Sequence, residues 1–108
     1  MTTPTLTPSE APDVVTRAMN GDTDALGDLY TEYNGLVFRF IYKRVGNRAL
    51  AEDLTADVFV RVIKRIGTNF QWQGTNIGAW ILAISRNIIA DHYKSRRFRD
   101  DQVSDLYD

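Results

Sequence analysis

The sequence predicts one all-α domain, a compact four-helix bundle of three long helices plus a short N-terminal helix. Apolar residues recur at steps of three and four along most of the chain, the spacing that gathers them on one face of a helix. Runs that alternate apolar and polar residues, as strands do, never exceed a few residues. The 108 residues are 44% hydrophobic and 25% charged, the composition of a single globular domain that forms a core without disulfides or a structural metal.

The N-terminal part divides into a leader and a short helix. Residues 1–12 are rich in Thr and Pro and have few large apolar side chains, so we expect a flexible leader. A helix is predicted from Asp13 to Asn20, because the turn-forming residues Gly21 and Asp22 follow it directly. Its apolar residues fall on one side: Val14, Val15 and Ala18.

Two longer helices are predicted next, each with one apolar stripe. The first covers residues 23–45, and its stripe comprises Leu26, Leu29, Tyr30, Tyr33, Val37, Phe40 and Ile41. Gly46 and Asn47 then provide a turn and a capping side chain. The second helix has an apolar residue at every fourth position until Gly67 stops it, and its stripe comprises Leu54, Val58, Val62 and Ile66.

A loop and a fourth helix complete the predicted bundle. Residues 67–76 have no helical period and contain two glycines, so they form the one substantial internal loop. The helix is expected to begin near Asn76 and to run to about Arg97. Its buried stripe comprises Ile77, Trp80, Ile81, Ile84 and Ile88.

Charge is segregated along the chain, although the net charge is only −1. Residues 1–34 carry one basic and six acidic residues, and residues 100–108 carry four acidic residues and no basic one. Residues 35–99 carry twelve basic and four acidic residues. A basic middle segment between acidic ends indicates a polyanionic partner, with a solvated basic surface as the alternative.

The fourth helix is predicted to present a basic, amide-bearing and aromatic face opposite its buried stripe. Helical spacing gathers there Arg86, Ala90, Tyr93 and Arg97, flanked by Asn87 and Lys94. Arg and Lys neutralise phosphates, and an Asn amide can read a base edge. In the preceding loop, Phe70 and Trp72 could stack on unpaired bases or could simply close the core.

The second long helix has an exposed face of another kind. It comprises Asp53, Ala56, Asp57, Val60 and Lys64. Two acids beside a small side chain and an outward valine are unsuited to phosphate but suited to docking a protein. An ordinary solvated face would account for the acids as well.

Catalytic and metal-binding signatures are missing, so no enzyme and no cofactor are expected. The chain has no cysteine and one histidine, His92, which we interpret as a partly buried structural residue. The segment that starts at Asp22 resembles a calcium loop, but Leu26 and Tyr33 occupy positions that need oxygen ligands. Without a signal peptide or an apolar run of about 20 residues, the protein is expected in the cytoplasm.

Three stretches of the sequence form a recognisable set: ALGDLYTEY at 25–33, AEDLTADVFVRV at 51–62 and GAWILAISRNIIADH at 78–92. Together they resemble region 2 of the extracytoplasmic-function (ECF) sigma factors of bacterial RNA polymerase. The similarity covers about residues 13–99, and the order and spacing of the last two stretches make it specific. The resemblance implies a cytoplasmic, nucleoid-associated promoter-specificity subunit without enzymatic activity of its own.

The resemblance also implies partners for both faces. The helix with Asp53 and Asp57 would dock on the clamp helices of the largest polymerase subunit, with Ala56 standing where many members carry Gln. The loop and the fourth helix would bind the non-template strand of the promoter minus-ten element, with Asn87 beside the pocket for a flipped base. Trp80 matches a core tryptophan. Anti-sigma factors commonly cover this region in the family.

The predicted organisation is a leader at 1–12, a region 2 domain at 13–99 and the acidic start of an interdomain linker at 100–108. Nothing in the sequence corresponds to the family's region 4 domain, so we expect the chain to be region 2 of a longer protein, with a one-domain relative as the alternative. A rival function is a helical interaction module that binds a regulator and does not contact DNA.

Overall fold

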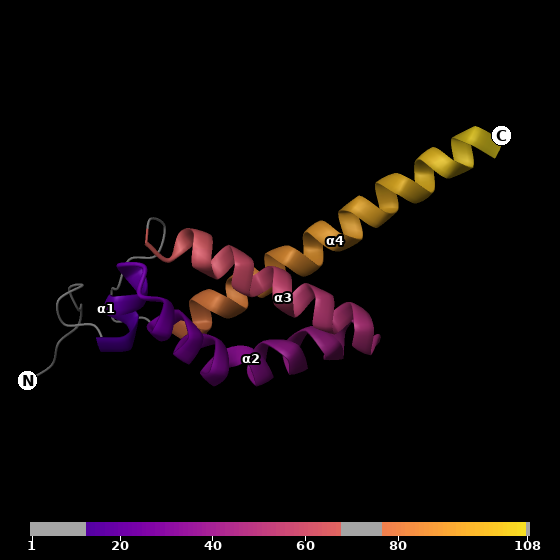
Figure 1. The fold of residues 1–108 in the computed structure, drawn as a ribbon. Coiled ribbons are helices and arrows are strands. Elements are labelled where there is room, and N and C mark those ends of the chain that lie inside the picture. Colours follow the sequence, from indigo (N-terminus) through magenta and orange to yellow (C-terminus); the bar gives the residue numbers. More distant parts are fainter. Residues whose placement is uncertain (1–12, 68–76, 108) are drawn as a thin grey trace, which may run out of the picture.

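The computed structural model describes residues 13–67 and 77–107, with side chains described as far as Arg96. All four elements in these ranges are helices (Figure 1). They are α1 (Asp13–Met19), α2 (Thr23–Val45), α3 (Arg48–Arg65) and α4 (Ile77–Tyr107). The predicted helices are confirmed, whereas the expectations for the leader and for most of the loop lie outside the described residues.

The ends of α2 and α3 are set by local hydrogen bonds. The Asp22 carboxylate caps α2 by accepting from the backbone N–H groups of Asp24 and Ala25, at 2.9 and 3.3 Å. Gly46 ends α2 with φ of 68°, a left-handed conformation that glycine adopts without steric cost. The Asn47 side chain then accepts from the Leu50 N–H at 2.9 Å and caps α3, as the sequence predicts.

The core lies where α2, α3 and α4 pack against one another. The predicted stripes of α3 and α4 are buried, apart from Trp80, which is half-buried and packs against the core. On α2 the prediction is wrong for Tyr30, whose side chain is 47% exposed. Tyr30 forms a T-shaped contact with the Phe59 ring of α3, at a centroid distance of 4.9 Å, and the rest of its ring faces solvent.

Arg17 ties α1 to the start of α2. Its guanidinium lies 3.5 Å from the Asp13 carboxylate, 3.5 Å from that of Asp22 and 3.8 Å from that of Asp28. These carboxylates belong to α1, to the cap of α2 and to the first turns of α2. Only Val15 and Ala18 of α1 are fully buried, so the ion pairs of Arg17 hold this short helix in place in addition to its apolar contacts.

The fourth helix is longer than predicted. It continues to Tyr107 and projects from the bundle (Figure 1), whereas loss of the apolar stripe suggested an end near Arg97. The backbone hydrogen bonds of a helix do not require an apolar stripe, and residues 98–107 contain no Gly or Pro to interrupt them. The linker assigned to residues 100–108 therefore begins as helix.

The turn after α3 passes close to the end of α1. A Cβ atom added at Gly67 would lie 2.9 Å from the carbonyl oxygen of Met19, a separation that real Cβ atoms essentially never show. Gly67 is thus needed for space, since its φ is not in the left-handed region. By contrast, a Cβ at Gly27 on α2 would meet nothing within 4 Å.

We expect Gly67→Ala to lower the free energy of unfolding by about 1–3 kcal/mol, because the methyl group must push apart the backbone of α1 and the turn. The matched control Gly27→Ala should raise it by about 0.5–1 kcal/mol, since alanine is favoured over glycine inside a helix. Chemical denaturation of both variants measures the difference. Equal stability of the two variants would contradict the close approach of Gly67 to Met19.

Candidate functional site

The exposed face of α3 is arranged as the sequence predicts. Asp53, Ala56, Asp57, Val60 and Lys64 are all exposed. Leu54, Val58 and Val62 are buried on the opposite side of α3. Because residues four apart lie on the same side of a helix, their burial turns the other side of α3 to solvent. Val60 is 50% exposed, an outward apolar side chain between the two carboxylates and Lys64.

An apolar groove between α2 and α3 borders this face on one side. Three large apolar side chains are exposed along it: Tyr30 at 47%, Val60 at 50% and Ile63 at 55%. Ala56 and Val60 line the groove together with Phe59 and Ile63. The groove continues along α2 past Leu26 and Gly27. Exposed apolar side chains grouped in this way are typical of surfaces that bind another protein.

The predicted face of α4 is also exposed. Arg86, Asn87, Ala90, Tyr93 and Lys94 lie on the surface, and the Tyr93 side chain is 39% exposed. The Tyr93 ring meets the His92 ring edge-on at 5.3 Å, which leaves part of the Tyr93 ring open to solvent. Phe70 and Trp72 lie outside the described residues, as does the side chain of Arg97. Whether the loop joins this face in one basic groove therefore stays a prediction.

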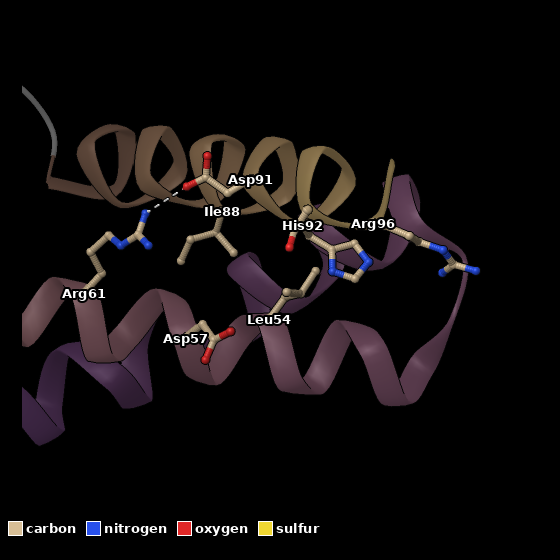
Figure 2. Close-up of a pocket in the computed structure, with 8 residues that line it drawn as sticks. Leu54, Asp57, Arg61, Ile88, Asp91, His92 and Arg96 are labelled. Atoms are coloured by element: carbon tan, nitrogen blue, oxygen red, sulfur yellow. Dashed lines mark ion pairs between the residues drawn. The ribbon is translucent and has the colours of Figure 1, made fainter. Parts of the chain in front are cut away.

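A second groove separates α3 from α4 (Figure 2). Leu54 and Ile88 line it together with a polar set that comprises Asp57, Arg61, Asp91, His92, Ser95 and Arg96. Arg61 of α3 and Asp91 of α4 form an ion pair across it at 3.7 Å, with side chains 32% and 62% exposed. The groove thus connects the α3 face, through Asp57, to the helix that carries the basic face.

His92 is partly buried, as the sequence predicts. Its Nε2 atom is buried and has no hydrogen-bond partner among the described residues. By contrast, two buried hydroxyl groups of the core do have partners: the Ser85 hydroxyl donates to the Ile81 carbonyl oxygen at 2.9 Å, and the Thr55 hydroxyl donates to that of Ala51 at 2.7 Å. His92 therefore contributes mainly by packing, at a cost for the unpaired nitrogen.

Several residues of these faces could not be assigned from the sequence. Ile63 lies off the four-residue stripe of α3, and that offset was the available signal for an exposed apolar residue. Tyr30 was counted with the buried stripe. The pairing of Arg61 with Asp91 depends on how α3 and α4 pack, and no spacing along the chain indicates it.

Three further properties of the described residues concern ionisation, metal ligation and membrane insertion. Burial raises the pKa of the Tyr33 hydroxyl above its ordinary value, and the Glu32 carboxylate raises it further, so this phenol stays protonated at neutral pH. In the described ranges, no three His, Cys, Asp or Glu side chains are grouped so as to hold a metal ion. None of the described helices is long and apolar enough to cross a membrane.

Comparison with known proteins decides the family. A profile of the family described as Sigma-70 region 2 matches residues 29–99. The chain belongs to the sigma-70 region 2 family. This match contains the whole of α3, the α3–α4 groove and the exposed face of α4, so the surfaces described above are surfaces of a region 2 domain.

Relatives of the chain include ECF sigma factors. The chain is 53% identical over 87 residues to the ECF RNA polymerase sigma factor BldN of Streptomyces coelicolor, which covers 81% of this chain and 33% of BldN. It is 33% identical over 88 residues to the RNA polymerase sigma factor CarQ of Myxococcus xanthus, which covers 82% of this chain and 49% of CarQ. The chain thus spans one third to one half of the length of these relatives.

A solved structure has the same fold. A chain of the RsbN–BldN complex superposes with a TM-score of 0.69 at 48% sequence identity, covering 77% of this chain and 59% of that chain. The predicted all-α region 2 bundle and the predicted resemblance to ECF sigma factors are therefore confirmed. The roles of the individual site residues stay predictions.

We expect His92→Leu to raise the free energy of unfolding by up to about 1 kcal/mol, because leucine keeps much of the packing and removes a buried nitrogen without a partner. His92→Ala should lower it, since that change removes the side-chain volume as well. Thermal denaturation of both variants provides the measurement. If His92→Leu lost as much stability as His92→Ala, the imidazole would have to make a polar interaction that the described residues do not supply.

Proposed function

We propose that the chain is region 2 of an ECF sigma subunit that docks on the clamp helices of core RNA polymerase and recognises and melts the promoter minus-ten element in transcription initiation. The observation that carries the proposal is the pair of exposed faces on a region 2 bundle, one acidic and apolar on α3, the other basic on α4. Such a subunit acts in the cytoplasm, on nucleoid DNA.

The α3 face is proposed to bind polymerase. Asp53 and Asp57 supply charge, which steers a basic partner, while exposed Val60 and Ile63 supply apolar area. Ala56 lines the α2–α3 groove beside these residues, and its small side chain leaves room for a side chain of the partner. Interfaces with an apolar centre and a charged rim are typical of specific protein complexes.

The α4 face is proposed to bind the non-template strand of the minus-ten element. Arg86 and Lys94 are exposed and can neutralise phosphates, and Tyr93 presents part of a ring on which a base can stack. The Asn87 side chain is exposed and makes no hydrogen bond to another described residue, and an amide offers a base edge both a donor and an acceptor. Phe70, Trp72 and Arg97 remain proposed members of this surface.

A regulator is proposed as a second partner. BldN, a relative of this chain, was solved in complex with RsbN. We extend this to a protein of the anti-sigma kind that covers the same faces and competes with polymerase. The rival function, an interaction module that never contacts DNA, predicts binding of such a regulator without any binding of core polymerase or promoter DNA.

We expect Asp53→Arg combined with Asp57→Arg to abolish binding of core RNA polymerase, because two attractive charges beside the apolar centre of the proposed interface become repulsive. Fluorescence anisotropy of the labelled chain titrated with core enzyme provides the affinity. Stability should change by within about 0.5 kcal/mol, since both side chains are exposed.

The matched control for this charge reversal is Glu32→Arg on α2, an exposed carboxylate outside the α3 face. It should leave core affinity unchanged. Unaltered core affinity in the Asp53→Arg and Asp57→Arg double variant would reject α3 as the docking helix, and equal losses in the control would show a non-specific charge effect.

We expect Asn87→Ala to reduce discrimination at one minus-ten position by about 1–3 kcal/mol, because alanine has no amide with which to distinguish base edges. Lys94→Ala, on the same flank of α4, should instead weaken binding to every promoter alike. It should also make the slope of log K against log salt concentration shallower by roughly 0.7–0.9, because one phosphate contact is lost. Binding of the polymerase complex to a series of minus-ten substitutions, repeated at several salt concentrations, measures both effects.

The alternative role of Asn87 is to hold the preceding loop closed by bonding its backbone. In that case Asn87→Ala would lose thermal stability and would lose affinity for every promoter base equally. An unchanged base preference at all positions would reject the base pocket.

A further inference from the structure

The end of the bundle at which α2 turns into α3 is strongly basic. Residues 33–51 contain four basic residues and no acidic one. These are Arg39, Lys43 and Arg44 of α2 and Arg48 of α3, all of them exposed, and we call them the basic patch. The patch lies around the Gly46–Asn47 turn, at the end of the bundle away from α1 (Figure 1). None of its residues is one of those that define the α3 face or the α4 face, although Arg48 and the neighbouring Phe38 line the α2–α3 groove.

Most of this charge is not neutralised by the side chains that the structure describes. Among the described residues, only Arg48 of the patch forms an ion pair, with Glu52 at 3.6 Å, and the Arg48 side chain is 79% exposed. Arg39 lies along α2 over Gly35, where a Cβ would come within 3.2 Å of its Nη1 atom. Gly35 thus leaves room for the Arg39 guanidinium on the helix surface, although glycine is unfavourable inside a helix.

Helix electrostatics account for half of the patch. Lys43 and Arg44 lie in the last turn of α2, where positive charge stabilises the helix dipole. Arg39 lies more than one turn earlier. Arg48 occupies the first turn of α3, where the dipole disfavours positive charge and where α3 has no acidic residue. The helix dipole therefore accounts for neither Arg39 nor Arg48, and among the described residues only Arg48 has a carboxylate partner, Glu52. A polyanionic ligand would account for the charge at Arg39 and would add to the ion pair at Arg48.

Aromatic rings accompany these charges. The Phe38 and Tyr42 rings stack at a centroid distance of 5.6 Å and an interplanar angle of 11°, and the Tyr42 side chain is 45% exposed. Arg48 lies 5.9 Å above the Phe38 ring, and Arg44 lies 3.7 Å above the Phe40 ring. The Tyr42 ring is thus held nearly parallel to a neighbouring ring, and a cation of the patch lies over that neighbour.

We propose that the basic patch, with the Phe38–Tyr42 stack, binds single-stranded nucleic acid separately from the α4 face. Phosphates would pair with Arg39 and Lys43, and an unpaired base would stack on the exposed Tyr42 ring, the combination by which proteins hold single strands without reading sequence. An acidic protein segment would use the charges but would leave the preorganised ring stack unexplained.

The test is photo-crosslinking of the whole chain to a single-stranded oligonucleotide that carries 5-iodouridine, followed by mass spectrometry of the adducts. Tyr42 and Tyr93, 45% and 39% exposed, report on the basic patch and on the α4 face respectively. We expect an adduct on Tyr42. Arg39→Ala with Lys43→Ala should reduce it at least five-fold, and Tyr42→Phe should keep oligonucleotide affinity within two-fold, whereas Tyr42→Ala should weaken it by roughly five-fold or more.

The matched control is Arg86→Ala with Lys94→Ala, which removes two charges from the α4 face. It should leave the Tyr42 adduct intact while reducing any adduct on Tyr93. The two adducts therefore report separately on oligonucleotide binding at the basic patch and at the proposed promoter-binding face of α4. Adducts on Tyr93 alone, or no binding of the oligonucleotide, would overturn the proposal. Displacement of the oligonucleotide by poly-glutamate at equal charge concentration, or equal affinity for duplex DNA, would overturn it too, in favour of an acidic protein or of simple phosphate attraction.

Discussion

The shared burial of one apolar stripe from each of α2, α3 and α4 is the constraint on which the rest of this structure depends. Each stripe contains wholly buried residues, among them Ile41, Val58 and Ile81. A helix that commits one side to a common core must turn its other side to solvent. Every surface that we assign to a partner is therefore oriented by the core, and the polar groups inside it are satisfied within their own helices, as at Thr55 and Ser85.

The helices carry different chemistry on the sides that they expose, and this separates the proposed partners. The α3 face combines carboxylates with Val60 and joins the apolar groove of α2, which suits a protein. The α4 face is basic and includes Asn87, which suits nucleic acid. Between them, the ion pair of Arg61 with Asp91 links the two helices across a polar groove. The helices that carry the two faces thus pack directly against each other, but the two faces have no residue in common.

Membership of the sigma-70 region 2 family and the surfaces of this chain support each other, but they carry different information. The family match covers residues 29–99 and makes polymerase and promoter DNA the natural candidates for partners. The geometry adds what the family alone does not specify for this chain: Ala56 and the exposed Ile63 line the α2–α3 groove, and the basic patch lies apart from the α4 face and reaches that groove through Arg48. The exposed stack of Phe38 and Tyr42 is part of that added information.

The sequence by itself determined that four helices form, where the Gly46 turn and the Asn47 cap lie, and most of each buried stripe, because these features depend on residues only a few positions apart. For the same reason it predicted correctly that Asp53, Asp57, Arg86 and Asn87 are exposed. Tertiary structure decided the exposure of Tyr30, the cross-helix pair of Arg61 with Asp91, the burial of His92 Nε2 away from any described partner, and the approach of Gly67 to Met19. Each depends on which helix lies beside which, and at what distance, and this is set by packing between residues far apart in the chain.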